Sequence, residues 1–160
     1  NGSEFLKYRS KGIEYHDMYS NIVLWGKLDD IWVDNKTENL FIADYKATSK
    51  KELVEIHPAF KMQMDIYCYI AQKIDDRFQE KTYFYYKNFI KAKDMESSHF
   101  ETDIISYEAN TSWVEKKLFE LKELLIEGFA PESSSDCKNC NYYNKLHKFH
   151  FLKKEEVLNV

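Results

Sequence analysis

Apolar and polar positions along the chain predict strands in two groups that are separated by a helix. Two extended stretches rich in β-branched and aromatic residues meet near Gly26, and residues 40–46 form a short apolar run that ends in charged residues. Such a run is typical of a central strand that is covered on both faces. The predicted strands cover residues 19–25, 27–34, 40–46, 81–88 and 100–107.

Two longer segments have helical spacing. The first, residues 59–76, is entered through Pro58 and repeats apolar residues along one side. The second, residues 112–127, opens with the capping-box pattern Ser112-Trp-Val-Glu115. This order of elements predicts an α/β protein with a mixed sheet flanked by helices.

A break in the pattern after the second helix predicts the domain organisation. Pro131 begins a short polar stretch that cannot continue a helix. We therefore expect one domain over residues 1–130 and a C-terminal tail over residues 131–160, which carries Cys137-Lys-Asn-Cys140.

The amino-acid composition limits the classes of protein to which the chain can belong. The chain has 160 residues, of which 44% are hydrophobic, enough to bury one core of ordinary size. Its net charge of -4 excludes a strongly basic nucleic-acid binder, so a nucleic-acid enzyme with this balance must gather its basic residues on one face. No apolar run reaches the roughly 20 residues that a membrane span needs. We expect no membrane contact and a cytoplasmic protein.

Two carboxylates and a lysine form the main candidate site. Asp44 and Lys46 are two residues apart at the end of a predicted strand and therefore share a face. If the first strands fold back beside the third, Asp29 meets Asp44 and the pair can bind Mg²⁺ or Mn²⁺ through oxygen. Lys46 could then orient or deprotonate a water or stabilise charge on a phosphate. The alternative is a surface ion pair at a strand end.

Gln63 and Tyr67 are the second candidate pair. Four residues are about one helical turn, so both side chains lie on one face of the first predicted helix. Polar groups in an otherwise apolar groove can bridge a carboxylate site and a phosphate. The alternative is a core tyrosine with a glutamine there by chance.

These motifs together resemble those of a known nuclease superfamily. Gly26-x-x-Asp29, then Asp44-Tyr45-Lys46, then Gln63-x-x-x-Tyr67 is similar to the RecB-type branch of the PD-(D/E)XK nucleases, which includes RecB and AddB nuclease domains and CRISPR-associated exonucleases. The resemblance implies a restriction-endonuclease-like core, with Asp29 and Asp44 as metal ligands and Lys46 as the catalytic lysine.

The resemblance also implies further ligands. The carbonyl of Tyr45 would be an additional metal ligand, and Gln63 with Tyr67 would support the site. The family usually has an upstream helix that supplies an acidic residue or a histidine, and little chain precedes Tyr8, so we expect this helix to be missing. His16 is the candidate replacement ligand.

The C-terminal cysteines leave several interpretations open. Cys137 and Cys140 have the spacing of half a zinc site or of a vestigial iron-sulfur site. His147 and His150 could complete a Cys₂His₂ set, and a pair of reduced thiols is an equal alternative.

The expected function is metal-dependent hydrolysis of DNA phosphodiester bonds, exonuclease-like, on single- or double-stranded DNA. DNA repair, recombination or mobile-element processing in a bacterial or phage setting, with a protein partner such as a helicase, fits the resemblance. The alternative is an inactive nucleic-acid-binding or assembly module that keeps the fold, which the acidic net charge would favour.

Overall fold

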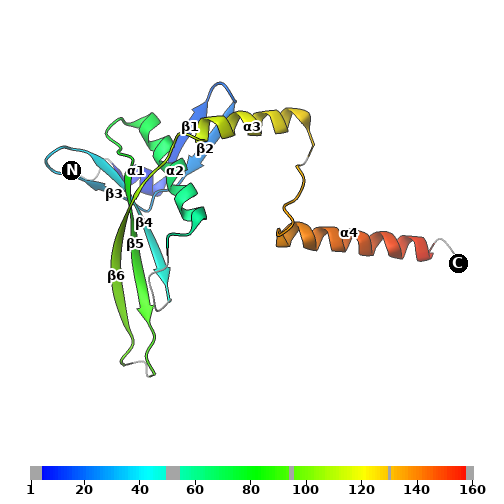
Figure 1. The fold of residues 1–160 in the computed structure, drawn as a ribbon. Coiled ribbons are helices and arrows are strands. Elements are labelled where there is room, and N and C mark those ends of the chain that lie inside the picture. Colours follow the sequence, from blue (N-terminus) through cyan, green and yellow to red (C-terminus); the bar gives the residue numbers. More distant parts are fainter. Residues whose placement is uncertain (1–4, 50–54, 94–95, 130, 158–160) are drawn as a thin grey trace. The chain divides into compact units, whose positions relative to one another are not determined.

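The computed structural model describes residues 5–49, 55–93, 96–129 and 131–157 (Figure 1). By contacts the chain divides into two compact units, residues 1–122 and 123–160. The helices are α1 (Leu6–Ser10), α2 (Pro58–Ile74), α3 (Val114–Glu127) and α4 (Lys138–Val157). The strands are β1 (Ile13–Asp17), β2 (Ile22–Gly26), β3 (Asp30–Val33), β4 (Leu40–Thr48), β5 (Lys81–Ile90) and β6 (His99–Glu108).

The main sheet has the order β3-β4-β5-β6 and is mixed. β3 and β4 pair antiparallel, β4 and β5 pair parallel, and β5 and β6 pair antiparallel. The parallel pair needs a crossover, which α2 provides between β4 and β5. The structure therefore confirms the predicted α/β class, a mixed sheet with helices packed against it, and this is consistent with a restriction-endonuclease-like core.

The start of the chain differs from the prediction. β1 and β2 form a separate antiparallel hairpin, and Tyr19 lies in its turn rather than in a strand (Figure 1). In that turn the Asp17 carboxylate accepts a hydrogen bond of 2.7 Å from the Ser20 N–H, and Asn21 has a positive φ of 57°. Such local contacts stabilise a turn where a propensity pattern alone extends the strand.

The core of the first unit lies between β4 and α2. Leu40 and Ile42 on β4 are fully buried, as are Met64 and Ile70 on α2 and Phe84 on β5. Alternate residues of β4 thus face the helix, and this alternation continues into the candidate site at the end of the strand.

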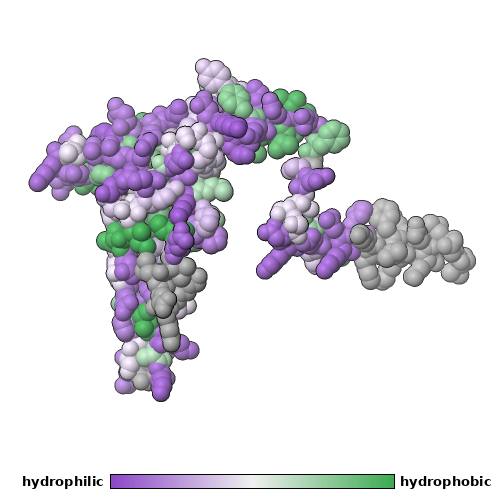
Figure 2. Space-filling model, in the orientation of Figure 1, coloured by the Kyte–Doolittle hydropathy of each residue, from purple (hydrophilic) through white to green (hydrophobic). Residues whose placement is uncertain are grey.

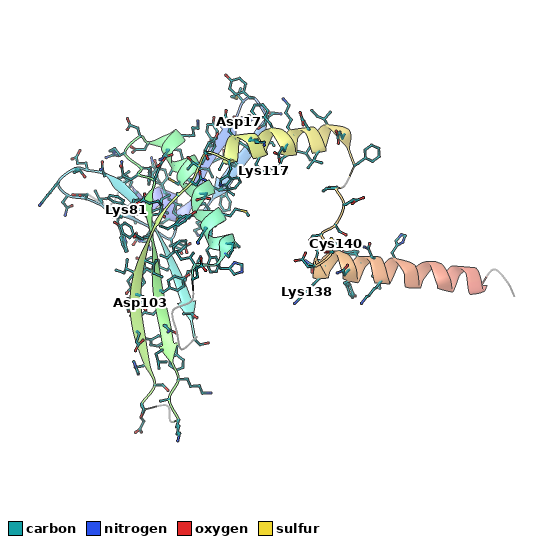
Figure 3. All side chains as sticks on the ribbon, in the orientation of Figure 1. Asp17, Lys81, Asp103, Lys117, Lys138 and Cys140 are labelled. Atoms are coloured by element: carbon teal, nitrogen blue, oxygen red, sulfur yellow. The ribbon has the colours of Figure 1, made fainter. Side chains whose placement is uncertain are left out.

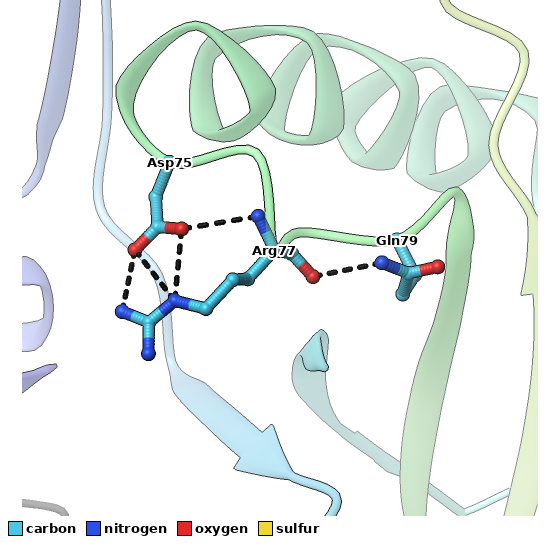
Figure 4. Close-up of polar contacts among 3 residues, drawn as sticks. All are labelled: Asp75, Arg77 and Gln79. Carbon is cyan, nitrogen blue, oxygen red and sulfur yellow. Dashed lines mark hydrogen bonds and ion pairs between the residues drawn. The ribbon is translucent and has the colours of Figure 1, made fainter. Parts of the chain in front are cut away.

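The connection from α2 to β5 is fixed by polar contacts (Figure 4). Arg77 donates hydrogen bonds to both carboxylate oxygens of Asp75, and Gln79 donates one to the Arg77 carbonyl. The backbone of this segment also pairs with Leu40 at the start of β4. The end of α2 is therefore tied to the strand that carries the candidate site.

The predicted helices are present with shifted ends. α2 begins at Pro58, with His57 accepting a hydrogen bond from the Ala59 N–H, and ends one residue before Asp75, which has extended backbone. α1 and α4 are additional. α1 is one short turn and α4 lacks a clear apolar stripe, so neither gives a helical pattern in the sequence.

The described surface is mostly hydrophilic, with hydrophobic side chains on β6 and α3 (Figure 2). Phe100 and Ile104 are the exposed apolar residues of β6. Within the described ranges, none of the helices has the length and apolar character that crossing a membrane requires.

Candidate active site

The end of β4 presents two charged side chains toward α2. Asp44 is only 4% exposed, and Lys46 is partly buried on the same face. Tyr45 points to the opposite face of the sheet, where it is 43% exposed and its hydroxyl donates to Asp30. The alternation predicted for this strand end is therefore present.

Asp29 lies beside this strand end because a backbone hydrogen bond holds it there. The Tyr45 N–H donates to Asp29 Oδ2 at 2.9 Å, across 16 residues of sequence. Buried Leu28 anchors the preceding position in the core. Asp29 therefore contacts the backbone of the residue next to Asp44. Burial raises the pKa of Asp44, and the negative charge of Asp29 adds to this effect.

Asp44 is held in an environment that disfavours its charge. Burial is the main cause that raises its pKa, and contact with Lys46 offsets this only in part. Lys46 Nζ lies 2.5 Å from Asp44 Oδ2 as an ion pair, and this buried oxygen accepts no further hydrogen bond among the described residues. A buried carboxylate oxygen in this state has capacity for another positive partner.

A polar chain connects the lysine to α2. Lys46 Nζ donates to Gln63 Oε1 at 3.4 Å, and Gln63 Nε2 donates to the Tyr67 hydroxyl oxygen at 3.0 Å. The Lys46 ammonium also lies 4.4 Å from the centre of the Phe60 ring, a cation–π distance. Gln63 and Tyr67 therefore share one face of α2, as the one-turn spacing predicted, and Gln63 contacts Lys46.

Gly26 makes room for this arrangement. A Cβ atom at position 26 would lie 2.4 Å from Cε1 and 2.9 Å from Cδ1 of Tyr67. Real Cβ atoms do not approach other atoms so closely, so only glycine lets the Tyr67 ring lie against the end of β2. The first and third sequence motifs thus meet through direct packing.

Most of the sequence also matches a known protein family. The sequence model of the PD-(D/E)XK nuclease superfamily matches residues 2–144. The chain belongs to this superfamily. No curated protein and no solved structure matches it. Membership suggests nuclease activity and a nucleic-acid substrate, and proteins of this superfamily typically use a divalent metal ion.

The residues of this PD-(D/E)XK chain fit a metal ion that keeps much of its hydration. Among the described residues, no three side chains of His, Cys, Asp or Glu gather into a complete ligand set. Asp29 and Asp44 offer oxygen atoms, and the buried Asp44 Oδ2 has Lys46 as its one polar partner among the described residues. Mg²⁺ commonly binds one or two carboxylates and retains several waters, so two carboxylates are an adequate protein contribution.

His16 does not join the two carboxylates. It is exposed near the turn of the β1–β2 hairpin, and its Nε2 contacts the Asn21 side chain at 2.9 Å. The hairpin end at Gly26 pairs with Ile13, three residues from His16, which is about 10 Å along a strand. The role proposed for His16 as a ligand therefore has no geometric support in the described structure.

Cys137 and Cys140 lie in the second unit, where Cys140 is in the first turn of α4 (Figure 3). The Cys140 N–H donates to Cys137 Sγ at 3.4 Å, and this hydrogen bond is the main cause that lowers the pKa of Cys137. The side chain of His150 lies outside the described residues. The metal site predicted for this segment stays a prediction.

Two acidic residues have tertiary roles that the sequence patterns did not predict. Asp30 accepts a hydrogen bond from the Tyr45 hydroxyl at 2.7 Å and contacts Arg9 at 3.7 Å. Asp65, inside the Gln63-x-x-x-Tyr67 segment, is buried and accepts three hydrogen bonds from residues 42 to 48 positions later in the chain. Only the tertiary structure gives these roles, because the partners are distant in sequence.

Proposed function

We propose that this chain is a divalent-metal-dependent nuclease of the RecB-type branch that hydrolyses phosphodiester bonds of DNA, as an exonuclease. One observation carries the proposal: the nearly buried Asp44 lies beside both Asp29 and Lys46 at the end of a central strand. Burying a carboxylate is costly, and proteins of this superfamily keep acidic and lysine side chains at such a position for phosphodiester chemistry.

Asp29 and Asp44 would hold the metal ion, with the carbonyl of Tyr45 as a further ligand. A metal ion bound there would lower the pKa of an attacking water and polarise the phosphate. The burial of Asp44 supports this role, since a dry site strengthens the attraction between a carboxylate and a cation.

Lys46 would act on the water or on the phosphate. Its ammonium is held between Asp44 and Gln63, which limits the positions it can take. From there Lys46 can orient the attacking water and stabilise the negative charge that develops on the phosphate oxygens. Gln63 and Tyr67 are positioning residues, because they act through Lys46.

A second candidate function is an inactive nucleic-acid-binding or assembly module. It is favoured by the net charge of -4 and by the presence of two rather than three ligating side chains at the site within the described ranges. In this case nucleic-acid binding would be salt-sensitive and would not change when Asp44 is replaced.

The proposal is tested with end-labelled single-stranded DNA, double-stranded DNA and RNA in Mn²⁺ or Mg²⁺. We expect cleavage of DNA, released from one end, that falls by about 100-fold or more in Lys46→Ala and in Asp44→Asn, since each removes a charge that acts on the reacting atoms. Lys36→Ala is the control, because Lys36 is an exposed lysine in the β3–β4 turn. Equal cleavage in all variants, or none by the wild type, would reject the nuclease proposal.

DNA repair, recombination or mobile-element processing, with a helicase as partner, is the setting that we propose for this activity. The RecB-type motif order supports it, and the labelled substrates also separate single- from double-stranded preference and give the polarity.

A further inference from the structure

A cavity of about 560 Å³ that is largely open to solvent lies beside Asp29 and α1. Its walls come from the end of α1 and from the segment that joins β2 to β3, two parts of the chain that the nuclease motifs do not explain. It is lined by Leu6, Arg9, Ser10, Lys27, Leu28 and Asp29.

Arg9 and Lys27 give this cavity two basic side chains. Both residues are exposed, so their charged groups reach solvent at the cavity mouth. Arg9 lies outside the three sequence motifs. Lys27 occupies a variable position of the first motif, Gly26-x-x-Asp29, and the motif does not require a lysine there. The chain has a net charge of -4, so two basic residues beside the candidate site create a local positive charge in an acidic protein.

Arg9 is oriented by a weak ion pair. Its guanidinium lies 3.7 Å from Asp30 Oδ1, and Asp30 is itself fixed by the Tyr45 hydroxyl and by the Ile31 N–H. Arg9 is half exposed, so this pair contributes little to stability. An arginine has five N–H donors in a fixed fork, which leaves donors for a ligand with several acceptor oxygens.

Asp29 also lines the cavity, and its negative charge affects which ligands can bind there. Its carboxylate would repel an anion, and a divalent cation on Asp29 and Asp44 would remove that repulsion. A polynucleotide whose phosphate is hydrolysed at this metal site has at least one neighbouring phosphate along its backbone. The cavity shares Asp29 with the candidate metal site, and Arg9 and Lys27 line the same cavity.

We propose that this cavity binds a backbone phosphate adjacent to the one that is hydrolysed, through Arg9 and Lys27. This inference rests on the proposed function, because the reacting phosphate at Asp29 and Asp44 fixes which neighbour enters the cavity. Arg9 and Lys27 are thus substrate-binding residues that set the register of the nucleic acid.

The test compares Arg9→Ala and Lys27→Ala with two charge-matched controls. Lys7→Ala removes a positive charge from the same short helix, two residues from Arg9 and so on the opposite side of α1, outside the cavity. Lys36→Ala removes one from a turn at the far end of β3. Cleavage kinetics are measured in Mn²⁺ on a single-stranded oligonucleotide, and binding of the same oligonucleotide is measured by fluorescence anisotropy in the uncleaving Lys46→Ala background at several salt concentrations.

We expect Arg9→Ala and Lys27→Ala to raise KM and Kd about 5- to 30-fold each, with kcat changed less than about 3-fold, because they lose a contact shared by the bound substrate and the transition state. The slope of log Kd against log salt should fall by about 0.7 for each variant, the value for one phosphate contact on a single strand. Arg9→Lys keeps the positive charge and should recover most of the affinity for the oligonucleotide. A variant that failed to fold would not recover it.

Two results would overturn the inference. The first is a KM and a salt slope for both variants equal to those of Lys7→Ala and Lys36→Ala, with cleavage intact. The second is a fall in kcat without a change in Kd. If the wild type does not cleave at all, the proposed nuclease function fails, and the anisotropy data alone decide whether Arg9 and Lys27 bind the nucleic-acid backbone.

Discussion

At the scale of single residues, Gly26 determines whether Tyr67 can approach the candidate site. A methyl group at position 26 would overlap the Tyr67 ring at 2.4 Å. We predict that Gly26→Ala displaces this ring, weakens the Gln63 and Lys46 contacts, and lowers cleavage by at least about 10-fold. Overpacking of this kind typically costs about 1–3 kcal/mol, so thermal unfolding should also occur at a lower temperature.

A double variant separates the two effects. Replacing Tyr67 by alanine in the Gly26→Ala background removes the overlap, so the unfolding temperature should recover in part. Cleavage should stay low, because the hydrogen bond from Gln63 to Tyr67 is gone. Normal cleavage in Gly26→Ala alone would contradict this account of the packing.

The sequence allowed the catalytic candidates to be predicted because their geometry is local. Asp44 and Lys46 share a face through strand alternation, and Gln63 and Tyr67 share one through the helical turn. The contact between Gly26 and Tyr67 and the role of Asp30 depend on distant segments, so no pattern along the chain could show them.

At the scale of elements, Asp65 connects α2 to the end of β6 and to the start of α3. Its carboxylate is 6% exposed and accepts hydrogen bonds of 2.9 Å from the Tyr107 hydroxyl, the Asn110 N–H and the Trp113 indole. Burial and Asp65 together raise the pKa of Tyr107 to about 12, so this phenol remains a donor at neutral pH.

We predict that Asp65→Ala destabilises the protein by about 2–4 kcal/mol, because it leaves several buried donors without an acceptor. For a chain of this size the unfolding temperature should fall by roughly 5–12 °C. Asp76→Ala, at an exposed acidic position after α2, is the control and should have almost no effect. Differential scanning calorimetry compares the two, and equal melting temperatures would refute the role of Asp65.

The ion pair between Asp75 and Arg77, in the segment that joins α2 to β5, makes a pH-dependent contribution to the free energy of unfolding. Hydrogen bonds from Arg77 lower the pKa of Asp75 below its usual value of 3.8. A carboxyl group with a lowered folded-state pKa stabilises the fold above its unfolded-state pKa, and this contribution is lost as pH falls through the folded-state pKa. Arg77 is 39% exposed, so solvent screening keeps the effect below about 1 kcal/mol.

We therefore predict that Arg77→Met lowers the unfolding temperature by roughly 2–3 °C at neutral pH, and that most of this difference disappears near pH 3. Asp75→Asn should lose the same pH-dependent part, since it removes the other member of the pair. Thermal melts of the three proteins at both pH values test this. A difference that is the same at both pH values would show that Arg77 does not act through its ion pair with Asp75.

The arrangement of elements was only partly predictable. The succession of strands and helices from β3 to α3 follows from apolar runs and helical spacing, whereas the parallel pairing of β4 with β5 across α2 is given only by the structure. The separation of the β1–β2 hairpin from the main sheet could not be predicted, because both of its strands and β3 have the same strand-forming composition. The turn of the hairpin depends on the contact between Asp17 and Ser20. The register of β6 against β5 likewise comes from pairing across the sheet.

At the scale of the whole molecule, the candidate site lies entirely within the unit of residues 1–122, and the two C-terminal cysteines lie in the other. We predict that replacing Cys137 and Cys140 by serine leaves Mn²⁺-dependent cleavage within about 3-fold of the wild type, since no catalytic step uses them. Elemental analysis of the purified wild type accompanies the assay. Loss of cleavage with release of zinc or iron would contradict this separation.

The central claim is that Asp29 and Asp44 hold a divalent metal ion. The most direct measurement is calorimetric titration of Mn²⁺ into the wild type and into Asp44→Asn, which keeps the size of the side chain and removes its charge. We predict binding to the wild type at one site, and at least a 10-fold loss of affinity in the variant. Equal affinity in both proteins, or no binding by the wild type, would contradict the assignment of this carboxylate pair as the metal site.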